Sequence, residues 1–219
     1  MSTTRISPSK PPAVSDQVAT ATQRRECFVT IGATASFRAL VDATTSAVFL
    51  QALRGLGYTH LTLQCGPDLD HLERQSGPAS PRAVARAHDI ALRAFDFNKA
   101  GLGREMRGCK RGAGRTEGVV ICHAGAGTIL DAMRIDVPLI VVPNPELLDN
   151  HQAELAEELE RQGYVTYGNL SSISAALEAS ERKSRARTAW PPVNSGERGV
   201  MDIVDQELGY ETRMRETLD

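Results

Sequence analysis

The chain has 219 residues, 41% of them hydrophobic, which is enough for one substantial core with appendages but hardly for two full domains. Its formal net charge of -2 at pH 7 gives no indication of a nucleic-acid-binding or membrane-surface protein. No stretch approaches the roughly 18 consecutive apolar residues of a membrane span.

The N-terminal residues and the cysteines indicate a cytosolic protein. Residues 1–25 are rich in Ser, Thr, Pro and Ala, which predicts a disordered tail without the apolar core of a secretory signal. The cysteines show no CxxC spacing, and small buried hydrophobic residues are favoured over a disulfide or a metal site. These cysteines are Cys27, Cys65, Cys109 and Cys122.

The first ordered elements predict a strand, a helix and a second strand. Residues 27–35 begin as a β-rich run that enters a Gly-Ala-Thr turn. Residues 36–57 place apolar side chains near helical spacing and end at two glycines. Residues 60–66 read as the next strand. This βαβ order within about 40 residues is typical of a parallel sheet.

The middle of the chain is less regular. Residues 67–90 carry prolines and charges with little periodicity, apart from a short turn near His71, and residues 91–98 hold another short strand. Residues 99–117 are rich in glycine and arginine, a composition that can grip phosphates or RNA but here lacks interleaved aromatic side chains. A surface loop, or a degraded helix, is therefore the favoured interpretation.

The second half predicts strands that alternate with helices, so the expected fold is α/β, a doubly wound parallel (Rossmann-like) sheet. The expected elements are residues 118–125, 128–135, 137–143, 149–163, 164–169 and a helix that begins near Ser171. The α/β domain is expected over residues 26–180, with a linker at 181–198 and a C-terminal helix and tail at 199–219.

One strand-to-helix turn, within the run VVICHAGAGTILD, has the character of an anion site. Its small side chains would let an anion approach the free N–H groups and the positive dipole end of the helix that follows. His123 and Thr128 add donors, whereas Asp131 would repel phosphate but suits a pair of sugar hydroxyls. The set predicts a nucleotide diphosphate, with a tight helix–strand packing turn as the alternative. The candidates are His123, Ala124, Gly125, Ala126, Gly127, Thr128 and Asp131.

Two further loops follow strands at the same expected edge. The first contains Gly32, Ala33 and Thr34, followed by Ala35 and Ser36, and offers N–H groups at a helix start. The second runs through polar residues that can contact sugar hydroxyls, or that form a capped helix start. These residues are Asp149, Asn150, His151 and Gln152. Three such loops on one edge favour a binding site over three unrelated turns.

Several motifs together resemble the nucleotide-sugar-binding half of the GT-B glycosyltransferases. HAGAG-T-x-x-D, VPLIVVPN and LLDNHQAELAEEL are similar to glycosyltransferase family 28, and closest to the family of cytosolic catalytic subunits of the eukaryotic UDP-N-acetylglucosamine transferase in the dolichol pathway. FVTIGATASFRALV and LQCG support the same resemblance, which covers residues 27–66 and 118–170 well and 67–117 poorly.

The resemblance implies a chemistry for each loop. The glycine-rich turn cradles the diphosphate of UDP-GlcNAc, Asp131 holds the ribose, and Asp149–Gln152 contact the sugar. The family works without a bound metal or cofactor and transfers GlcNAc with inversion to GlcNAc-pyrophosphate-dolichol, forming a β1,4 linkage. Helix dipoles and backbone donors would offset the charge on the departing UDP.

The resemblance also implies a partner, because this chain has sequence for only one of the two GT-B halves. The other half, which binds the lipid-linked acceptor, is expected on a membrane-anchored subunit that recruits this chain to the cytosolic face of the endoplasmic reticulum. The expected contacts are Val200, Ile203, Val204 and Leu208.

The catalytic base stays unassigned. His123 and His151 have suitable pKa ranges but are better explained as donor-site ligands, and the partner is the other possible source.

The sequence leaves two alternatives to the transferase. A UDP-sugar-binding regulatory module without transfer activity is the main alternative. A dinucleotide-dependent redox enzyme is disfavoured, because the first turn lacks GxGxxG and no acidic residue ends the second strand.

Overall fold

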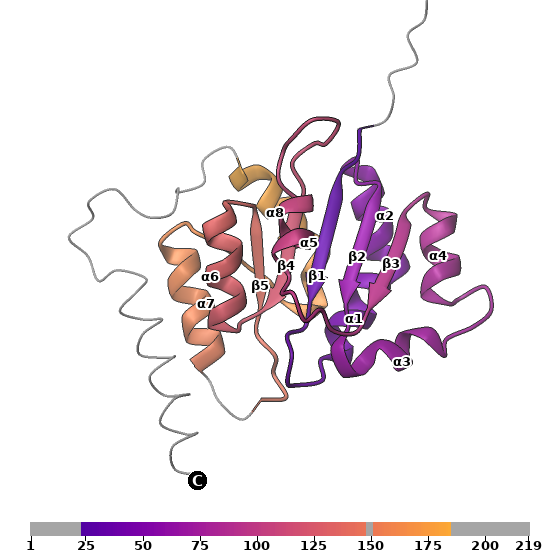
Figure 1. Ribbon diagram of the computed structural model, residues 1–219, viewed down its shortest axis with the longest axis horizontal. Helices are drawn as coiled ribbons and strands as arrows, with labels where there is room; N and C mark the ends of the chain where they lie inside the picture. The colour runs from indigo at the N-terminus through magenta and orange to yellow at the C-terminus, as the bar shows by residue number, and fades with distance from the viewer. Residues whose placement is uncertain (1–22, 148–150, 185–219) are drawn as a thin grey trace, which may run out of the picture.

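The computed structural model describes residues 23–147 and 151–184 (Figure 1). Within them, six strands form one sheet in the order β3-β2-β1-β4-β5-β6. The strands are β1 (Glu26–Thr30), β2 (His60–Gln64), β3 (Ala91–Phe95), β4 (Val119–His123), β5 (Leu139–Val142) and β6 (Thr166–Tyr167). Every pairing is parallel, which confirms the doubly wound sheet. The strand order reverses between β1 and β4, where folds of this kind bind their ligands.

Helices cover both faces of this sheet. They are α1 (Arg38–Thr45), α2 (Ala47–Gly55), α3 (Leu69–Glu73), α4 (Pro81–Ala87), α5 (Gly103–Gly108), α6 (Ala126–Ile135), α7 (His151–Arg161) and α8 (Ile173–Lys183), with short 3-10 turns η1 (Gly66–Asp68) and η2 (Leu170–Ser172). One core layer contains apolar side chains of α1, α2, α4 and α8, and the other contains those of α5, α6 and α7.

The central strands are buried on both sides, which explains their continuous apolar sequences. In β1, Cys27 and Val29 enter one layer while Phe28 enters the other, as the two-residue repeat of a strand requires. The four cysteines are free and buried, as expected from their spacing. Burial raises the pKa of the Cys65 thiol to about 12, so it stays protonated at neutral pH.

The expected single helix over residues 36–57 is wrong, because the chain forms two helices that are separated at Ser46. This residue is extended, with φ -65° and ψ 151°, and its hydroxyl accepts a hydrogen bond from the N–H of Phe49. The hydroxyls of Thr44 and Thr45 bond back to carbonyls of α1. Ser46 thus caps a new helix instead of continuing the first.

The middle of the chain is more regular than its sequence suggests. The expected strand over residues 91–98 is confirmed as β3. Residues 67–90 contain α3 and α4, and the glycine- and arginine-rich stretch 99–117 contains α5 before its loop. At the other end, α8 continues through Lys183, past the expected domain limit at Ser180.

Several expectations fall on residues that the structure does not describe. These are most of the N-terminal tail, Asp149, Asn150, most of the expected linker, and the C-terminal segment with Val200, Ile203, Val204 and Leu208. Among the helices of residues 23–147 and 151–184, none is both long and apolar enough to cross a bilayer.

Candidate functional site

The loops that follow β1 and β4 meet at the carboxyl edge of the sheet through the ring of His123. A Cβ atom added at Gly32 or at Gly125 would lie less than 3.0 Å from atoms of this imidazole. Gly32 also has φ +84°, which side chains other than glycine rarely adopt. Packing against His123 therefore explains these two glycines without any ligand.

Gly127 differs from both, because nothing in its own surroundings requires a glycine. A Cβ atom added there would have no heavy atom within 4 Å, and its φ is not positive. Gly127 lies in the first turn of α6, where glycine costs about 0.5–1 kcal/mol relative to alanine. An external group that approaches the backbone would explain this residue, as the sequence interpretation expects.

The start of α6 has free hydrogen-bond donors. No side chain caps this helix, and the first helical bond runs from the N–H of Ile129 to the carbonyl of Gly125. Within the described residues, the N–H groups of Ala126, Gly127 and Thr128 donate to no other group. Free donors at the positive end of a ten-residue helix can bind an anion.

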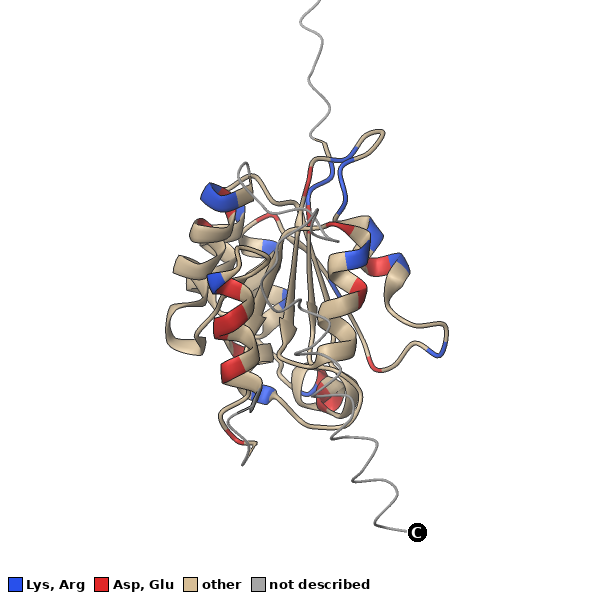
Figure 2. Cartoon of the chain, turned by 90° about the vertical axis from the view of Figure 1, so that its left-hand side faces the viewer, with Lys and Arg blue, Asp and Glu red and all other residues tan. Residues whose placement is uncertain are grey.

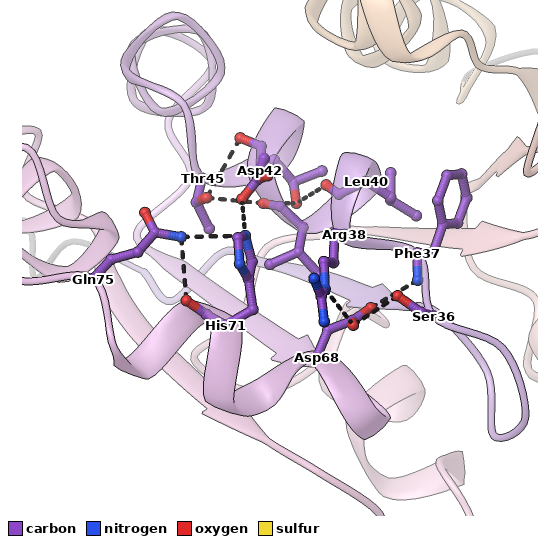
Figure 3. A network of polar contacts seen from close by, with 11 residues as sticks. Ser36, Phe37, Arg38, Leu40, Asp42, Thr45, Asp68, His71 and Gln75 are labelled. Carbon is purple, nitrogen blue, oxygen red and sulfur yellow. Dashed lines mark hydrogen bonds and ion pairs between the residues drawn. The ribbon is translucent and has the colours of Figure 1, made fainter. Parts of the chain in front are cut away.

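The start of α1, in contrast, already holds an anion, the carboxylate of Asp68 (Figure 3). Asp68 is only 1% exposed and accepts hydrogen bonds from the N–H of Phe37 and the hydroxyl of Ser36, both at 2.7 Å. The guanidinium of Arg38 lies 3.2 Å from the same carboxylate. The expectation of a free helix start after β1 is therefore wrong at Phe37.

The other candidates of the first loop have distinct surroundings. Gly32 donates its N–H to the hydroxyl of Thr30, whereas Ala33 and Thr34 are exposed. These two residues therefore border the carboxyl edge as exposed side chains.

Gln64 holds this edge together and was missed from the sequence. It is 2% exposed, and its Nε2 donates to the carbonyl of Gly32 at 3.0 Å and to that of Asp96 at 2.9 Å. Its Oε1 accepts from the hydroxyl of Thr30. The side chain thus joins the ends of β1, β2 and β3. The only signal in the sequence was a polar residue at the end of the strand HLTLQ.

Asn144 brings the loop after β5 to the same place. Its Nδ2 donates to the carbonyl of Ser36 at 3.1 Å, and its backbone N–H donates to Oε1 of Gln152 at 3.4 Å. A cleft of about 500 Å³ lies beside these residues and is also lined by Tyr167 and Asn169. The described parts of the three expected loops therefore lie together. The backbone of His151 begins α7, whereas Asp149 and Asn150 lie outside the described residues.

Asp131 lies four residues after Gly127, on the same exposed face of α6. Its carboxylate is 3.6 Å from the guanidinium of Arg134, and both side chains are more than half exposed. Exposed ion pairs of this kind contribute little stability, so a ligand can take the place of Arg134 at low cost. Asp131 can therefore accept hydrogen bonds from a ligand bound at the helix start.

His123 is predominantly neutral at pH 7. Burial lowers the pKa of its imidazole, and the backbone carbonyl of Thr30 opposes this shift. Its Nδ1 atom is buried without a hydrogen-bond partner in the described part of the chain. A neutral imidazole has a single N–H, so a hydrogen bond from His123 to an anion at the α6 start would replace the one to the carbonyl of Thr30.

Comparisons with known proteins identify relatives of this chain. Residues 113–188 match the model of the glycosyltransferase family 28 C-terminal domain. The UDP-N-acetylglucosamine transferase subunit ALG13 of Saccharomyces cerevisiae is 32% identical over 163 residues, which cover 65% of this chain and 77% of the yeast protein. The mouse protein of the same name is 34% identical over 156 residues, but the match spans only 12% of its length.

A solved structure agrees with this assignment. The solution NMR structure of ALG13 superposes with a TM-score of 0.52 at 25% sequence identity, and the match covers 84% of this chain and 95% of that one. The sequence resemblance, the family model and the fold therefore all indicate the same family. The chain belongs to the family of the UDP-N-acetylglucosamine transferase subunit ALG13.

Proposed function

We propose that this chain binds UDP-GlcNAc and acts as the donor-binding catalytic subunit of a two-subunit transferase. The complex would add the second GlcNAc, with inversion and a β1,4 linkage, to GlcNAc-pyrophosphate-dolichol in the synthesis of N-glycan precursors. The observation that carries the proposal is the uncapped start of α6, with a glycine that its own packing does not require. Family membership supports the identity of the nucleotide sugar.

The diphosphate would lie against the N–H groups of Ala126, Gly127 and Thr128, with the Thr128 hydroxyl as a further donor. Negative charge develops on UDP as the glycosidic bond breaks. Because fixed backbone donors and the helix dipole already point at this position, they stabilise that charge more than they stabilise the ground state. The proposal includes no metal ion and no cofactor.

The remaining groups of the site would hold the two sugars. Asp131 would release Arg134 and accept hydrogen bonds from the ribose hydroxyls. Gln152, whose side chain faces the backbone of Asn144, would contact the GlcNAc together with Asp149, Asn150 and His151. The catalytic base would be His123, His151 or a group of the partner, and the proposal does not choose among them.

The acceptor half of the enzyme is proposed on a membrane-anchored partner, which would hold this chain at the cytosolic face of the endoplasmic reticulum. The description of the relatives as a subunit supports such a partner. The proposed contacts are Val200, Ile203, Val204 and Leu208, beyond the described residues.

A calorimetric titration with UDP-GlcNAc tests the donor site. We expect saturable binding by the wild-type chain and at least about tenfold weaker binding by Asp131→Ala, because hydrogen bonds to a charged group contribute about 1.5–3 kcal/mol. Asp70→Ala is the matched control, since Asp70 is an exposed acid that pairs with Arg74 on α3. Absence of binding by the wild type, or equal losses in both variants, would contradict the proposed donor site.

A transfer assay tests the division of the enzyme into two chains. The purified chain should show no transfer, and the chain with its membrane-anchored partner should transfer GlcNAc to the lipid-linked acceptor. Full turnover by the chain alone would refute the divided site. Binding without turnover in any pairing would instead identify a regulatory UDP-sugar-binding module.

A further inference from the structure

A second polar cleft, of about 320 Å³, lies away from the donor edge. Its lining includes Arg24, Glu26, Arg93, Arg104, Glu105 and Arg115. Arg24 precedes β1 and Arg115 lies in the loop before β4, so the cleft is near the amino ends of these strands. Figure 2 shows basic segments of the chain side by side at the upper end of the molecule, beyond the amino end of the sheet. The donor site lies at the opposite, carboxyl edge.

The acidic groups of this cleft neutralise only part of its positive charge. Arg24 pairs with Glu26 at 2.9 Å, and Arg93 pairs with Glu105 at 3.2 Å. Arg104 and Arg115 have no acidic partner among the described residues. The four arginines and two carboxylates therefore leave a formal excess of two positive charges around one cleft.

The acidic side of the cleft is fixed in position by the fold. Glu26 is buried, accepts a hydrogen bond from the hydroxyl of Thr62 at 2.7 Å, and would contact any side chain introduced at Gly108. Glu105 is 8% exposed, and its Oε2 has no hydrogen-bond partner in the described residues. A buried carboxylate oxygen without a partner costs free energy. The polar groups of the cleft thus do not fully satisfy one another.

We propose that this cleft binds a phosphorylated polyol, with its phosphate on Arg104 and Arg115 and its hydroxyls toward Glu26 and Glu105. A phosphate dianion matches the excess charge, and the planar guanidinium groups match phosphate oxygens in geometry. The volume is at the lower limit of small-ligand pockets, which suits a single sugar phosphate or inositol phosphate group. Such a group can come from a soluble metabolite or from the headgroup of a membrane lipid.

The glycine- and arginine-rich stretch of the sequence supplies much of this site. Residues 99–117 contain six basic and two acidic side chains, and their lack of aromatic residues disfavours stacking on nucleic-acid bases. The helix α5 and the loop after it bring Arg104, Glu105 and Arg115 to the cleft. Phosphate binding thus accounts for a composition that a plain surface loop would not need.

An NMR titration with inositol monophosphate tests the site for a soluble ligand. We expect saturable shifts of the amide resonances of Thr62, Glu105 and Gly108, whereas those of Gly127 and Thr128 stay in place. The Arg104→Ala/Arg115→Ala variant should bind inositol monophosphate at least about tenfold more weakly, because each hydrogen bond from a guanidinium to the phosphate contributes substantially to the binding free energy. Arg74→Ala/Arg82→Ala is the control, because it removes the same charge from arginines that pair with acids outside the cleft.

Co-sedimentation with phosphatidylcholine vesicles that contain phosphatidylinositol phosphate tests the lipid source. Binding to these vesicles that is lost in Arg104→Ala/Arg115→Ala, but not in the control pair, would identify a headgroup. Shifts with inositol monophosphate and no vesicle binding would identify a soluble ligand. No saturable response in either arm, or equal losses in the two double variants, would overturn the proposal. UDP-GlcNAc binding is measured on each variant as well. Unchanged binding shows that the variant is folded and that its donor site is intact, so a loss at the cleft can be told apart from a failure of the proposed function.

Discussion

At the scale of single residues, the glycines at the carboxyl edge of the sheet differ in what surrounds them. The imidazole of His123 occupies the space that a side chain at Gly32 or Gly125 would need, whereas the space around Gly127 is open. We therefore expect Gly127→Ala to raise the free energy of unfolding by about 0.5–1 kcal/mol, because alanine is the better helix former. The same variant should bind UDP-GlcNAc more weakly, since its methyl group would stand where the diphosphate approaches. Urea unfolding and calorimetry measure the two effects.

Gly55→Ala provides the control for this pair of opposite effects. Gly55 is the last residue of α2, has no heavy atom within 4 Å of an added Cβ, and is remote in sequence from the donor loops. The Gly55→Ala variant should have a higher free energy of unfolding than the wild type and the same affinity for UDP-GlcNAc. If Gly127→Ala left the affinity unchanged as well, the close approach of the diphosphate at this position would be refuted.

His123 makes stability depend on pH in a predictable direction. Its pKa in the folded protein lies below the usual 6.5, so the unfolded chain takes up the proton first. The stability that the neutral ring contributes is therefore present above pH 6.5 and declines as the pH falls below that value. We expect the free energy of unfolding to fall less between about pH 7.5 and pH 5 in His123→Gln than in the wild type.

His60 provides a reference for that experiment. Partial burial and the nearby Arg24 lower its pKa as well, so its contribution has the same sign. Urea unfolding of His60→Gln over the same pH range would separate the two histidines. Identical pH profiles for the wild type and His123→Gln would contradict the buried, neutral state of His123.

At the scale of elements, the two helix starts at the carboxyl edge differ in whether a side chain accepts from their N–H groups. Asp68 caps α1 from another part of the chain, whereas α6 has no cap. Asp68→Ala would leave the buried N–H of Phe37 and the hydroxyl of Ser36 without this acceptor. We expect a loss of about 2–3 kcal/mol in the free energy of unfolding, measured with urea.

The neighbouring Asp70 separates this capping effect from a simple loss of charge. Its carboxylate is exposed and pairs with Arg74 within one helix turn, so Asp70→Ala should change stability very little. Equal losses in Asp68→Ala and Asp70→Ala would show that the cap does not hold α1. The affinity for UDP-GlcNAc offers a second readout, because Ser36 also accepts the hydrogen bond from Asn144.

The elements differ in how visible they are in the sequence. The buried strands β4 and β5 were predictable, because a parallel sheet covered on both faces produces continuous apolar runs. Ser80 and Pro81, a cap followed by a first-turn proline, could have revealed α4. The sequence indicates the helix α5 only as an alternative to a surface loop, because this helix spans six residues with a glycine at each end and its one buried side chain is Met106. Short helices of this kind depend on tertiary packing more than on their own propensity.

The proposed donor site shows the same division. The strand-to-helix turn from His123 to Asp131 was predictable from its sequence, because a strand, small residues and a helix follow one another directly. Gln64 and Asp68 could not, because each acts on a loop about 30 residues earlier in the chain. Such long-range hydrogen bonds leave no local pattern, since either residue alone is an ordinary polar side chain.

At the scale of the whole molecule, Arg25 and Glu181 join the start of the sheet to the last described helix. The guanidinium of Arg25 donates to both oxygens of Glu181, at 2.7 and 2.6 Å, and lies over the ring of Tyr58. The hydroxyl of Tyr58 donates to the same carboxylate at 2.7 Å. The two charged residues are 156 positions apart and lie just outside the domain limits expected from the sequence. This cluster therefore makes α8, up to its last turn, part of the core fold.

The coupling between Arg25 and Glu181 provides the test at this scale. In a double-mutant cycle of Arg25→Met and Glu181→Gln, we expect a coupling free energy of about 1–3 kcal/mol, measured by urea unfolding, because the pair is bidentate and largely shielded from solvent. The control cycle uses Arg182→Met and Glu178→Gln, a more exposed pair one turn apart on the same helix. That pair should show almost no coupling, since both side chains remain solvated. Equal couplings in the two cycles would mean that α8 is held by its apolar face alone, through residues such as Leu177, and that the partly buried ion pair adds no stability of its own.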